Sequence, residues 1–371
     1  MHIDQVIKYF EEWAPKGVAW KDDNIGLQVG NPENRVSNVM LSLELDEKVL
    51  EQAIKKNCNL IITHHPFIFN PIKNLNFSNN KKAQLIEKLI QEKISLYSAH
   101  TNLDFTKGGV SFELAKKLGL KDIQFLVNQE GNQYKLVVYV PLDNVAEVSD
   151  AIFNAGGGII GEYTKCSTQT IIDGTFEGSR LANPAKGTKN NFEVVTEVRL
   201  EILVNSWKLN SIIDAMKSVH PYEEPAYDVL LIKNKNVNYG AGAIGELTTS
   251  MNSKDFLSHT RKSLKAEALK FTPGKSSKIK KVAVCGGSCS DLINNAISSK
   301  ADAFITADIK YHTFQDAENN ILLIDAGHYE TEVHVLNPIK LRLDKFVRRD
   351  KSKVKIFKYS GSTNPIKFYN K

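Results

Sequence analysis

The sequence predicts an α/β protein in which two α/β lobes are interrupted by a smaller α+β insertion. Short, wholly apolar strands such as NLIIT alternate with amphipathic helices near both ends of the chain, whereas longer strands of mixed polarity fill the middle. Apolar strands buried on both faces are typical of parallel sheets covered by helices. We expect a first lobe over residues 1–129, an inserted domain over 130–234 and a second lobe over 235–371.

The first lobe reads as strands and helices in alternation. Asp4 can cap a helix over 5–13, whose Val6, Phe10 and Trp13 share one face. Strands are expected at 38–43, 59–63 and 95–99, and further helices near 46–56, 82–93 and 111–118. This repetition predicts a mostly parallel sheet with right-handed crossovers.

The middle segment contains the same plan twice. A strand at 134–140 leads into a helix at 143–155, and a strand at 192–204 leads into a helix at 207–219. Further strands are expected at 168–176 and 226–232. Two strand–helix halves of this kind predict a ferredoxin-like βαββαβ domain.

The α/β style returns in the second lobe. Strands are expected at 281–285, 303–306, 321–325 and 354–359, and helices at 253–264, 291–298, 312–318 and 329–348. Each assignment follows the change from short apolar runs to amphipathic spacing.

Composition excludes several classes of protein. No apolar run approaches the roughly 18–20 residues of a membrane helix. Four cysteines in 371 residues are too few for a disulfide framework, so we expect a cytoplasmic protein with reduced thiols. The net charge is +6, but residues 340–371 hold eleven Lys and Arg against two Asp, so the rest of the chain has no basic excess and we expect no nucleic-acid partner.

Histidine and carboxylate side chains follow three of the predicted parallel strands. They are His64 and His65 in THHP, His100 and Asp104 in HTNLD, and His328 and Glu332 in GHYETE. Ligands bind beyond the carboxyl ends of strands in open α/β sheets. The last pair is spaced by four residues and so shares one face of a helix. We therefore expect the clusters to meet in one cleft.

The set of side chains fits a metal site. Imidazole and carboxylate ligands together suit Zn, Mn, Fe or Ni better than Ca or Mg, and the set exceeds the three protein ligands of one catalytic ion. Each cluster alone would more often be a strand cap or a solvated helix face, but three at strand ends favour two ions bridged by a carboxylate. Asp308 and His312 either line the same cleft or are a helix cap and a surface histidine.

Five blocks resemble one known family. They are GLQVG at 26–30, LIITHHPFIF at 60–69, SAHTNLDF at 98–105, ADAFITADIKYH at 301–312 and LLIDAGHYETE at 322–332. They are similar to the signature blocks of the NIF-three-like dinuclear metal-centre family, also labelled GTP cyclohydrolase I type 2 homologues. HPYEEPAYDV at 220–229 resembles the PII/CutA-like domain inserted in the long bacterial members. Two departures, Cys289 and Ala307 in place of glycine, fall outside the ligand positions.

The resemblance implies two divalent metal ions per subunit, with zinc first and Mn, Fe or Ni as alternatives. It implies the ligands His64, His65, Asp104, His328 and Glu332, with Glu332 bridging. His65 and Asp104 would then complete one ion, and His64 and His328 the other. His100 would lie beside the site as a proton-transfer group, which makes His100 and Glu332 the candidate catalytic residues.

Two functions of different classes remain open. The first is a hydrolase that acts through a metal-activated water on GTP, another nucleotide or a phosphoester. The second is a non-catalytic metal-binding regulatory or scaffold protein whose inserted domain senses a ligand or mediates assembly. The resemblance further implies a homo-oligomer, a hexamer.

Overall fold

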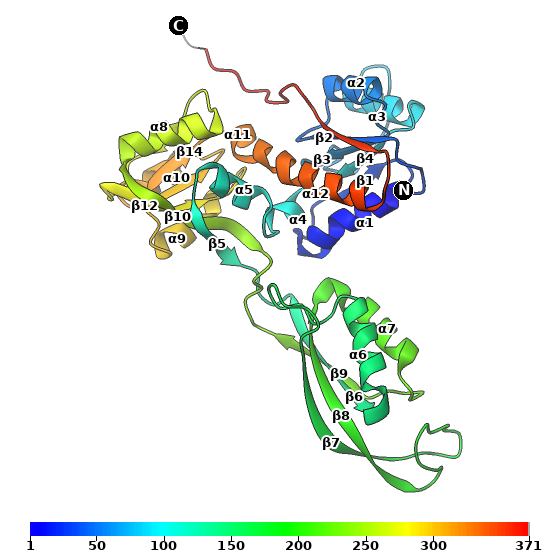
Figure 1. The fold of residues 1–371 in the computed structure, drawn as a ribbon. Coiled ribbons are helices and arrows are strands. Elements are labelled where there is room, and N and C mark those ends of the chain that lie inside the picture. Colours follow the sequence, from blue (N-terminus) through cyan, green and yellow to red (C-terminus); the bar gives the residue numbers. More distant parts are fainter. Residues whose placement is uncertain (370–371) are drawn as a thin grey trace. The chain divides into compact units, whose positions relative to one another are not determined.

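The computed structural model describes residues 1–369 and contains two compact units. One unit combines Met1–Val127 with the chain from Tyr239 onward, and the other is Asn128–Asn238 (Figure 1). The first unit holds two sheets and every residue expected at the metal site.

The first sheet of the larger unit has the strand order β1-β4-β3-β2-β15. Its strands are β1 (Gly26–Val29), β2 (Asn38–Ser42), β3 (Leu60–Thr63), β4 (Ser95–Ser98) and β15 (Lys355–Lys358). All neighbours are parallel except β1 and β4. The strands β3 and β4 are buried along their whole length, as the apolar sequence of β3 predicts.

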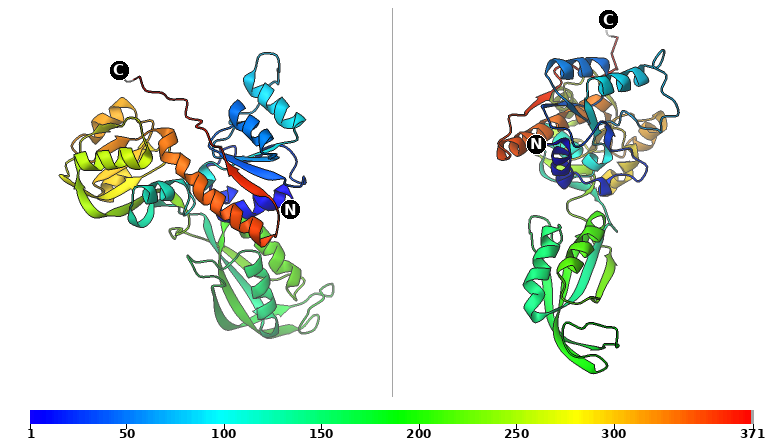
Figure 2. Two further views of the ribbon diagram at one scale, coloured as in Figure 1. Left: turned by 45° about the horizontal axis from the view of Figure 1, so that its top comes forward. Right: turned by 90° about the vertical axis from the view of Figure 1, so that its right-hand side faces the viewer.

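Helices cover both faces of this sheet (Figure 2). One face packs against α1 (Ile3–Trp13) and α12 (Leu336–Arg349), and the other against α2 (Glu47–Lys55) and α3 (Lys81–Gln91). The buried residues Ile3, Val6, Ile7 and Phe10 of α1 recur at helical spacing. The helix α2 begins where the side chain of Asp46 accepts a hydrogen bond from the Val49 N–H.

The second sheet has the order β11-β14-β13-β12-β10-β5. Its strands are β5 (Lys121–Asn128), β10 (Gly240–Asn252), β11 (Lys270–Thr272), β12 (Lys278–Val284), β13 (Ala303–Thr306) and β14 (Leu322–Asp325). The central strands β12, β13 and β14 are parallel, while β10 is antiparallel to β12 and β11 is antiparallel to β14. One face packs against α5 (Val110–Lys117) and α8 (Ser253–Leu264), the other against α9 (Ile293–Ser298) and α10 (Tyr311–Ala317).

The lobes do not coincide with the two ends of the chain, which corrects the expected limits of 1–129 and 235–371. The helix α5 and the strand β5 belong to the core of the second sheet, and α12 and β15 belong to the first. Periodicity identifies a strand or a helix but not the sheet that it joins, so the exchange of these segments is absent from the sequence pattern.

The predicted helix over 329–348 is also divided. The structure contains α11 (His328–Glu332), a 3₁₀ turn η5 (Val333–Val335) and then α12. Pro338 lies in the first turn of α12 and has no N–H, and its ring would clash with the carbonyl four residues earlier in a continuous helix. The break therefore keeps α11 as a separate short helix.

The smaller unit is an antiparallel sheet with two helices. Its elements are β6 (Gln133–Pro141), α6 (Val145–Asn154), β7 (Ser167–Glu177), β8 (Phe192–Asn205), α7 (Leu209–Val219) and β9 (Tyr227–Ile232). The strand order β7-β8-β6-β9, with all pairs antiparallel, confirms the ferredoxin-like prediction. The helices α6 and α7 lie side by side against one face of the sheet (Figure 1).

Short 3₁₀ turns are η1 (Lys16–Val18), η2 (Leu142–Asn144), η3 (Ser206–Lys208) and η4 (Ser290–Leu292), and one short helix, α4 (Thr101–Asp104), follows β4. Within residues 1–369, none of the helices has the length and apolar character needed to cross a bilayer.

Candidate metal centre

Two neighbouring histidines leave the end of β3. The backbone N–H groups of His64 and His65 donate to the carbonyl oxygen of Leu43, 3.1 and 2.9 Å away. These bonds extend the parallel pairing with β2 beyond the strand end. Both imidazoles are thereby held at the carboxyl edge of the first sheet, where the sequence predicts a ligand site.

The next two side chains follow β4. His100 precedes α4, and Asp104 is the last residue of that helix. The N–H of Ala99 still pairs with the Thr63 carbonyl, 2.9 Å away, so the segment leaves the sheet next to the two histidines. One short helical turn then returns the Asp104 carboxylate toward them.

The remaining pair comes from the second sheet. Gly327 follows β14 with a φ of 89°, a conformation that favours glycine, and lets the chain turn into α11. His328 and Glu332 lie one turn apart on this helix, and their Nε2 and Oε1 atoms are 3.2 Å apart. Glu332 is only 3% exposed, so a carboxylate is buried between the two sheets.

The carboxylate of Glu332 lies within contact distance of histidines from both sheets. Its Oε2 lies 3.0 Å from His65 Nε2, and His65 Nε2 lies 3.3 Å from His328 Nε2. His65, His328 and Glu332 each present a ligand atom within 4.8 Å of the others. This arrangement can hold one metal ion.

A second group forms on the other side of Glu332. His64 Nε2 lies 3.5 Å from Asp104 Oδ1 and 3.8 Å from Glu332 Oε1. The expected grouping of His65 with Asp104, and of His64 with His328, concerns bound ions and stays a prediction; here His64 lies next to Asp104, and both His64 and His328 face Glu332 Oε1. The two imidazoles leave the strand end in different directions, and spacing alone does not say which partner each meets.

All four histidines of the site are anchored through Nδ1. The acceptors are the Ala99 carbonyl oxygen for His64 (2.8 Å), Glu44 for His65 (2.9 Å), Asp23 for His100 (2.9 Å) and Asp308 for His328 (2.5 Å). In metalloproteins, such bonds fix the tautomer and the ring orientation so that Nε2 faces the metal. The same pattern four times in one cleft is the arrangement that metal ligation requires.

Of the buried polar side-chain atoms that lack a hydrogen-bond partner among residues 1–369, three belong to this site. They are His64 Nε2, Asp104 Oδ1 and Glu332 Oε2. Unsatisfied buried polar atoms are costly, and these three point toward the same group of residues. Gly287 leaves room beside them, because a Cβ there would lie 2.4 Å from Glu332 Oε1. The donor set and the space therefore fit metal ions.

Protons provide the positive charge that this site needs when it holds no metal. Burial alone would lower the pKa of His65, but Glu332 and Glu44 raise it to about 10. Burial opposes the shift at His328 as well, yet Glu332 and Asp308 raise its pKa to about 9. Burial would raise the pKa of Glu332, but His328, His64 and His65 hold it well below its usual range.

In the second group, formed by His64 and Asp104, burial outweighs the neighbouring charges at the carboxylate. It raises the pKa of Asp104, an effect that His64 and His100 reduce. The pKa of His64 is raised despite burial because Asp104 and Glu332 attract its protonated form. A cation placed here would reverse the shift of Asp104 and displace the proton from His64.

Two anchoring carboxylates were missed by sequence reasoning. Glu44 follows β2 and Asp23 precedes β1, and their side chains hold His65 and His100. Glu44 obeys the same strand-end rule as the histidines and could have been found by it. Asp308 is placed against His328, whereas His312 is exposed on α10 and bonds Gln315.

His100 lies among the expected ligands and not at the edge of the site. Its ring centroid is 5.3 Å from that of His64 and 5.6 Å from that of His65, and the three histidines form a second set of ligand atoms within 4.8 Å of one another. Its position allows either contact with a metal or proton exchange at the site.

Two residues of the C-terminal segment form hydrogen bonds with carboxylates next to the site. The Thr363 hydroxyl donates to Glu44, and the Asn364 side-chain amide donates to Glu330 Oε1, 2.9 Å away. Glu330 is therefore turned away from the cluster, although it belongs to the same helix as Glu332.

Known proteins resemble this chain over nearly its whole length. The family described as Duf34/NIF3 (NGG1p interacting factor 3) matches residues 1–365. Relatives from Halalkalibacterium halodurans and Bacillus subtilis, both named GTP cyclohydrolase 1 type 2 homolog, are 34% and 35% identical, and each match covers 98% of both chains.

A crystal structure of a Bacillus cereus protein related to NIF3 has 34% identity and a TM-score of 0.86 over 100% of this chain and 99% of that one. A Staphylococcus aureus protein of known structure has 30% identity and a TM-score of 0.78 over the same shares. These matches confirm the predicted fold and the resemblance, and the chain belongs to the Duf34/NIF3 family.

Proposed function

We propose that this protein is a metal-dependent hydrolase with a dinuclear centre bridged by Glu332. The observation that carries the proposal is the convergence of three imidazoles, those of His64, His65 and His328, on the buried carboxylate of Glu332, with His100 beside them. Each imidazole has its Nδ1 atom held by an acceptor. Structural or solvated histidines do not require this shared orientation.

The distances suggest how the ligands are divided. His65 and His328, the two histidines nearest each other, would hold one ion with Glu332, and His64 and Asp104 would hold the other. Zinc suits this mixture of imidazole and carboxylate, with Mn, Fe and Ni as alternatives. The buried, partnerless atoms of His64, Asp104 and Glu332 support the same division.

Bound divalent ions supply Lewis acidity and lower the pKa of water toward about 7. The remaining chemistry belongs to the chain. Asp23 holds His100 Nδ1 at 2.9 Å, which leaves the other ring nitrogen to exchange a proton with water or with a leaving group. We assign His100 as the proton-transfer residue and Glu332 as the carboxylate that keeps the ions together.

The substrate is proposed from chemistry and from the relatives. An activated water can attack a phosphoester or a purine ring carbon. The relatives' shared name, GTP cyclohydrolase 1 type 2 homolog, supports a nucleotide. We therefore propose GTP, other nucleotides and simple phosphoesters as the substrates to test first.

Turnover of this panel, with and without each metal, is the direct experiment. Glu332→Gln should abolish hydrolysis, whereas Glu330→Gln on the same helix should retain it because Glu330 bonds Asn364 instead. His100→Ala should keep its metals and lose about 10²–10⁴-fold in rate. His312→Ala, an exposed histidine outside the cluster, is the matched control.

If no substrate shows metal-dependent turnover above the Glu332→Gln background, the hydrolase proposal is wrong. A metal-binding regulatory or scaffold protein would then be the better description, provided that the wild-type chain still binds metal. Measuring metal content in the same samples separates these outcomes.

The assembly and location are proposed with the function. We propose a homohexamer of the 41.5 kDa chain, on the strength of the family resemblance, and light scattering that finds a monomer at high and low concentration would contradict it. Four free cysteines support a reducing, cytoplasmic environment.

A further inference from the structure

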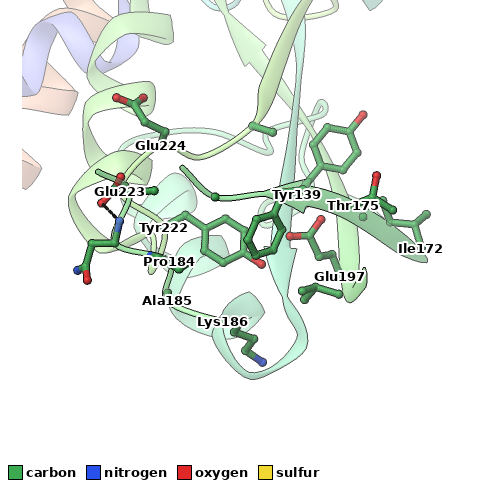
Figure 3. A pocket seen from close by; sticks show the side chains of 17 residues that line it. Tyr139, Ile172, Thr175, Pro184, Ala185, Lys186, Glu197, Tyr222, Glu223 and Glu224 are labelled. Atoms are coloured by element: carbon green, nitrogen blue, oxygen red, sulfur yellow. Dashed lines mark hydrogen bonds between the residues drawn. The ribbon is translucent and has the colours of Figure 1, made fainter. Parts of the chain in front are cut away.

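The smaller unit contains a cavity of about 410 Å³ (Figure 3). The strands β6, β7 and β8 form its floor, and residues 182–186 and 222–226 contribute its walls. Side chains alternate along a strand, and the core of this unit uses Val138, Val140 and Val198. Tyr139 and Glu197 therefore lie on the opposite face of the sheet from α6 and α7.

A buried carboxylate lies in this cavity. Glu197 is 8% exposed, and no lysine, arginine or histidine among residues 1–369 forms an ion pair with it. The cation two positions along the strand, Arg199, pairs with Glu201 at 3.0 Å. A buried carboxylate without a cation is costly, and a positively charged ligand would remove that cost.

A phenol hydroxyl lies beside the carboxylate. The Tyr222 hydroxyl is buried without a well-formed hydrogen bond. Burial and the neighbouring Glu197 raise the pKa of Tyr222 above its usual value, so the hydroxyl stays protonated and can donate or accept. Figure 3 shows the rings of Tyr139 and Tyr222 next to Glu197, which gives the cavity aromatic faces.

The walls are held in place by His220 and Glu223. The Nδ1 atom of His220 accepts from the Tyr222 N–H, and its Nε2 atom donates to the Tyr139 carbonyl oxygen, with both distances 3.1 Å. Glu223 accepts from the Asn183 N–H, also at 3.1 Å, and so fastens the loop between β7 and β8 to this segment. Hydrogen bonds of the HPYEEPAYDV block therefore hold the walls of the cavity in place.

The lining indicates the charge and shape of an occupant. Ile172, Phe176 and Val195 offer apolar contact, while Glu223 and Glu224 add negative charge at the wall. Lys186, which also lines the cavity, pairs with Asp143 at 3.2 Å. Cavities of this size and mixed character accept drug-sized molecules, and tyrosine faces attract cations.

We propose that this cavity binds a small organic cation with a flat, apolar body, an arylalkylamine, an aryl amidine or an aryl guanidine, whose charged head bonds Glu197. The body lies against the tyrosine rings and the apolar floor. The site is separate from the metal centre, because its residues belong to the smaller unit and every metal-ligand candidate belongs to the larger one.

The test is a titration of the full chain with benzamidine, phenethylamine and phenylguanidine, followed by calorimetry or ligand-observed NMR. Benzamide, the neutral counterpart of benzamidine, tests the charge. We expect benzamidine to bind at least about tenfold more tightly than benzamide, and Glu197→Gln to remove most of that difference. Glu147→Gln, an exposed carboxylate on α6, should bind like the wild type.

A second variant tests the same contact in case Glu197→Gln does not fold. A Cβ on Gly174 would lie 2.4 Å from Glu197 Oε2, so Gly174→Ala should displace the carboxylate and weaken benzamidine binding while keeping the charge. The proposal is overturned if none of the three cations binds, if benzamide binds as well as benzamidine, or if a folded Glu197→Gln binds like Glu147→Gln. Metal content should be unchanged in every variant, so this test does not depend on hydrolysis.

Discussion

The Nε2 atoms of His65 and His328 lie 3.3 Å apart, although 263 positions separate the two residues in the chain. Each ring comes from the carboxyl end of a different sheet, and each is held from behind by a carboxylate, Glu44 or Asp308. Two imidazoles this close to each other and to Glu332 can share a cation.

Removing the anchor of His328 should weaken metal binding without removing a ligand. Asp308→Asn keeps the shape of the side chain but loses the charge that orients Nδ1, so we expect metal affinity to fall about 10- to 100-fold. Competition with a chelator of known affinity would measure this. Asp316→Asn, an exposed residue on α10, should have no effect. Equal affinity of both variants would show that the Asp308 contact is incidental.

Filling the space beside Glu332 should harm the site more than the fold. Gly287→Ala places a Cβ 2.4 Å from Glu332 Oε1 and 3.4 Å from His328 Nε2. Gly119→Ala is the control, because it has a similar positive φ and open space around it. Both changes should cost about 1–2 kcal/mol of stability from backbone strain, while only Gly287→Ala should lose metal affinity. Thermal unfolding and metal titration together distinguish the two effects.

Metal binding should release protons and become tighter as the pH rises. The metal-free pKa values of His65 and His328 are raised to about 10 and about 9, so both rings carry protons at pH 7. Ligation requires neutral imidazole, and the protons must leave. Affinity should therefore increase from pH 7 toward pH 9–10. Calorimetry in buffers with different ionisation enthalpies counts the protons, and binding without proton release would contradict the proposed ligands.

The smaller unit should be removable without loss of metal. The chain enters and leaves it side by side, since Asn236 N–H donates to the Gln129 carbonyl oxygen, 2.8 Å away, and the Asn128 amide donates to the Asn236 carbonyl, also at 2.8 Å. Replacing residues 128–238 by a short Gly/Ser linker should leave metal content unchanged. A variant that is folded by circular dichroism but binds no metal would show that this unit contributes to the site.

The sequence predicted which residues lie together, because ligands bind beyond the carboxyl ends of the strands in an open α/β sheet. His64, His65, Asp104, His328 and Glu332 all lie together, and each was identified from its place after a strand or within one helical turn. The division of these ligands between two ions stays a prediction, because it depends on the direction in which each side chain leaves the strand end, and no periodicity encodes that direction.

Other features depend on contacts between distant segments. The anchor Asp23 lies before β1 in a turn without a regular pattern, and only the folded chain brings it to His100. The crossing of α12 and β15 to the first sheet is likewise a matter of tertiary packing. The cavity around Glu197 was not predicted, since it requires the loop between β7 and β8 to fold over the sheet.

A two-metal site that Glu332 bridges should bind a fixed number of ions, which the metal content after reconstitution measures. Elemental analysis of the wild type and of Glu330→Gln should find about two divalent ions per chain, as expected of two-metal sites. Glu332→Gln should lose both, because one carboxylate serves both ligand groups. Two ions retained in a folded Glu332→Gln, or one ion or none in the wild type, would contradict the account.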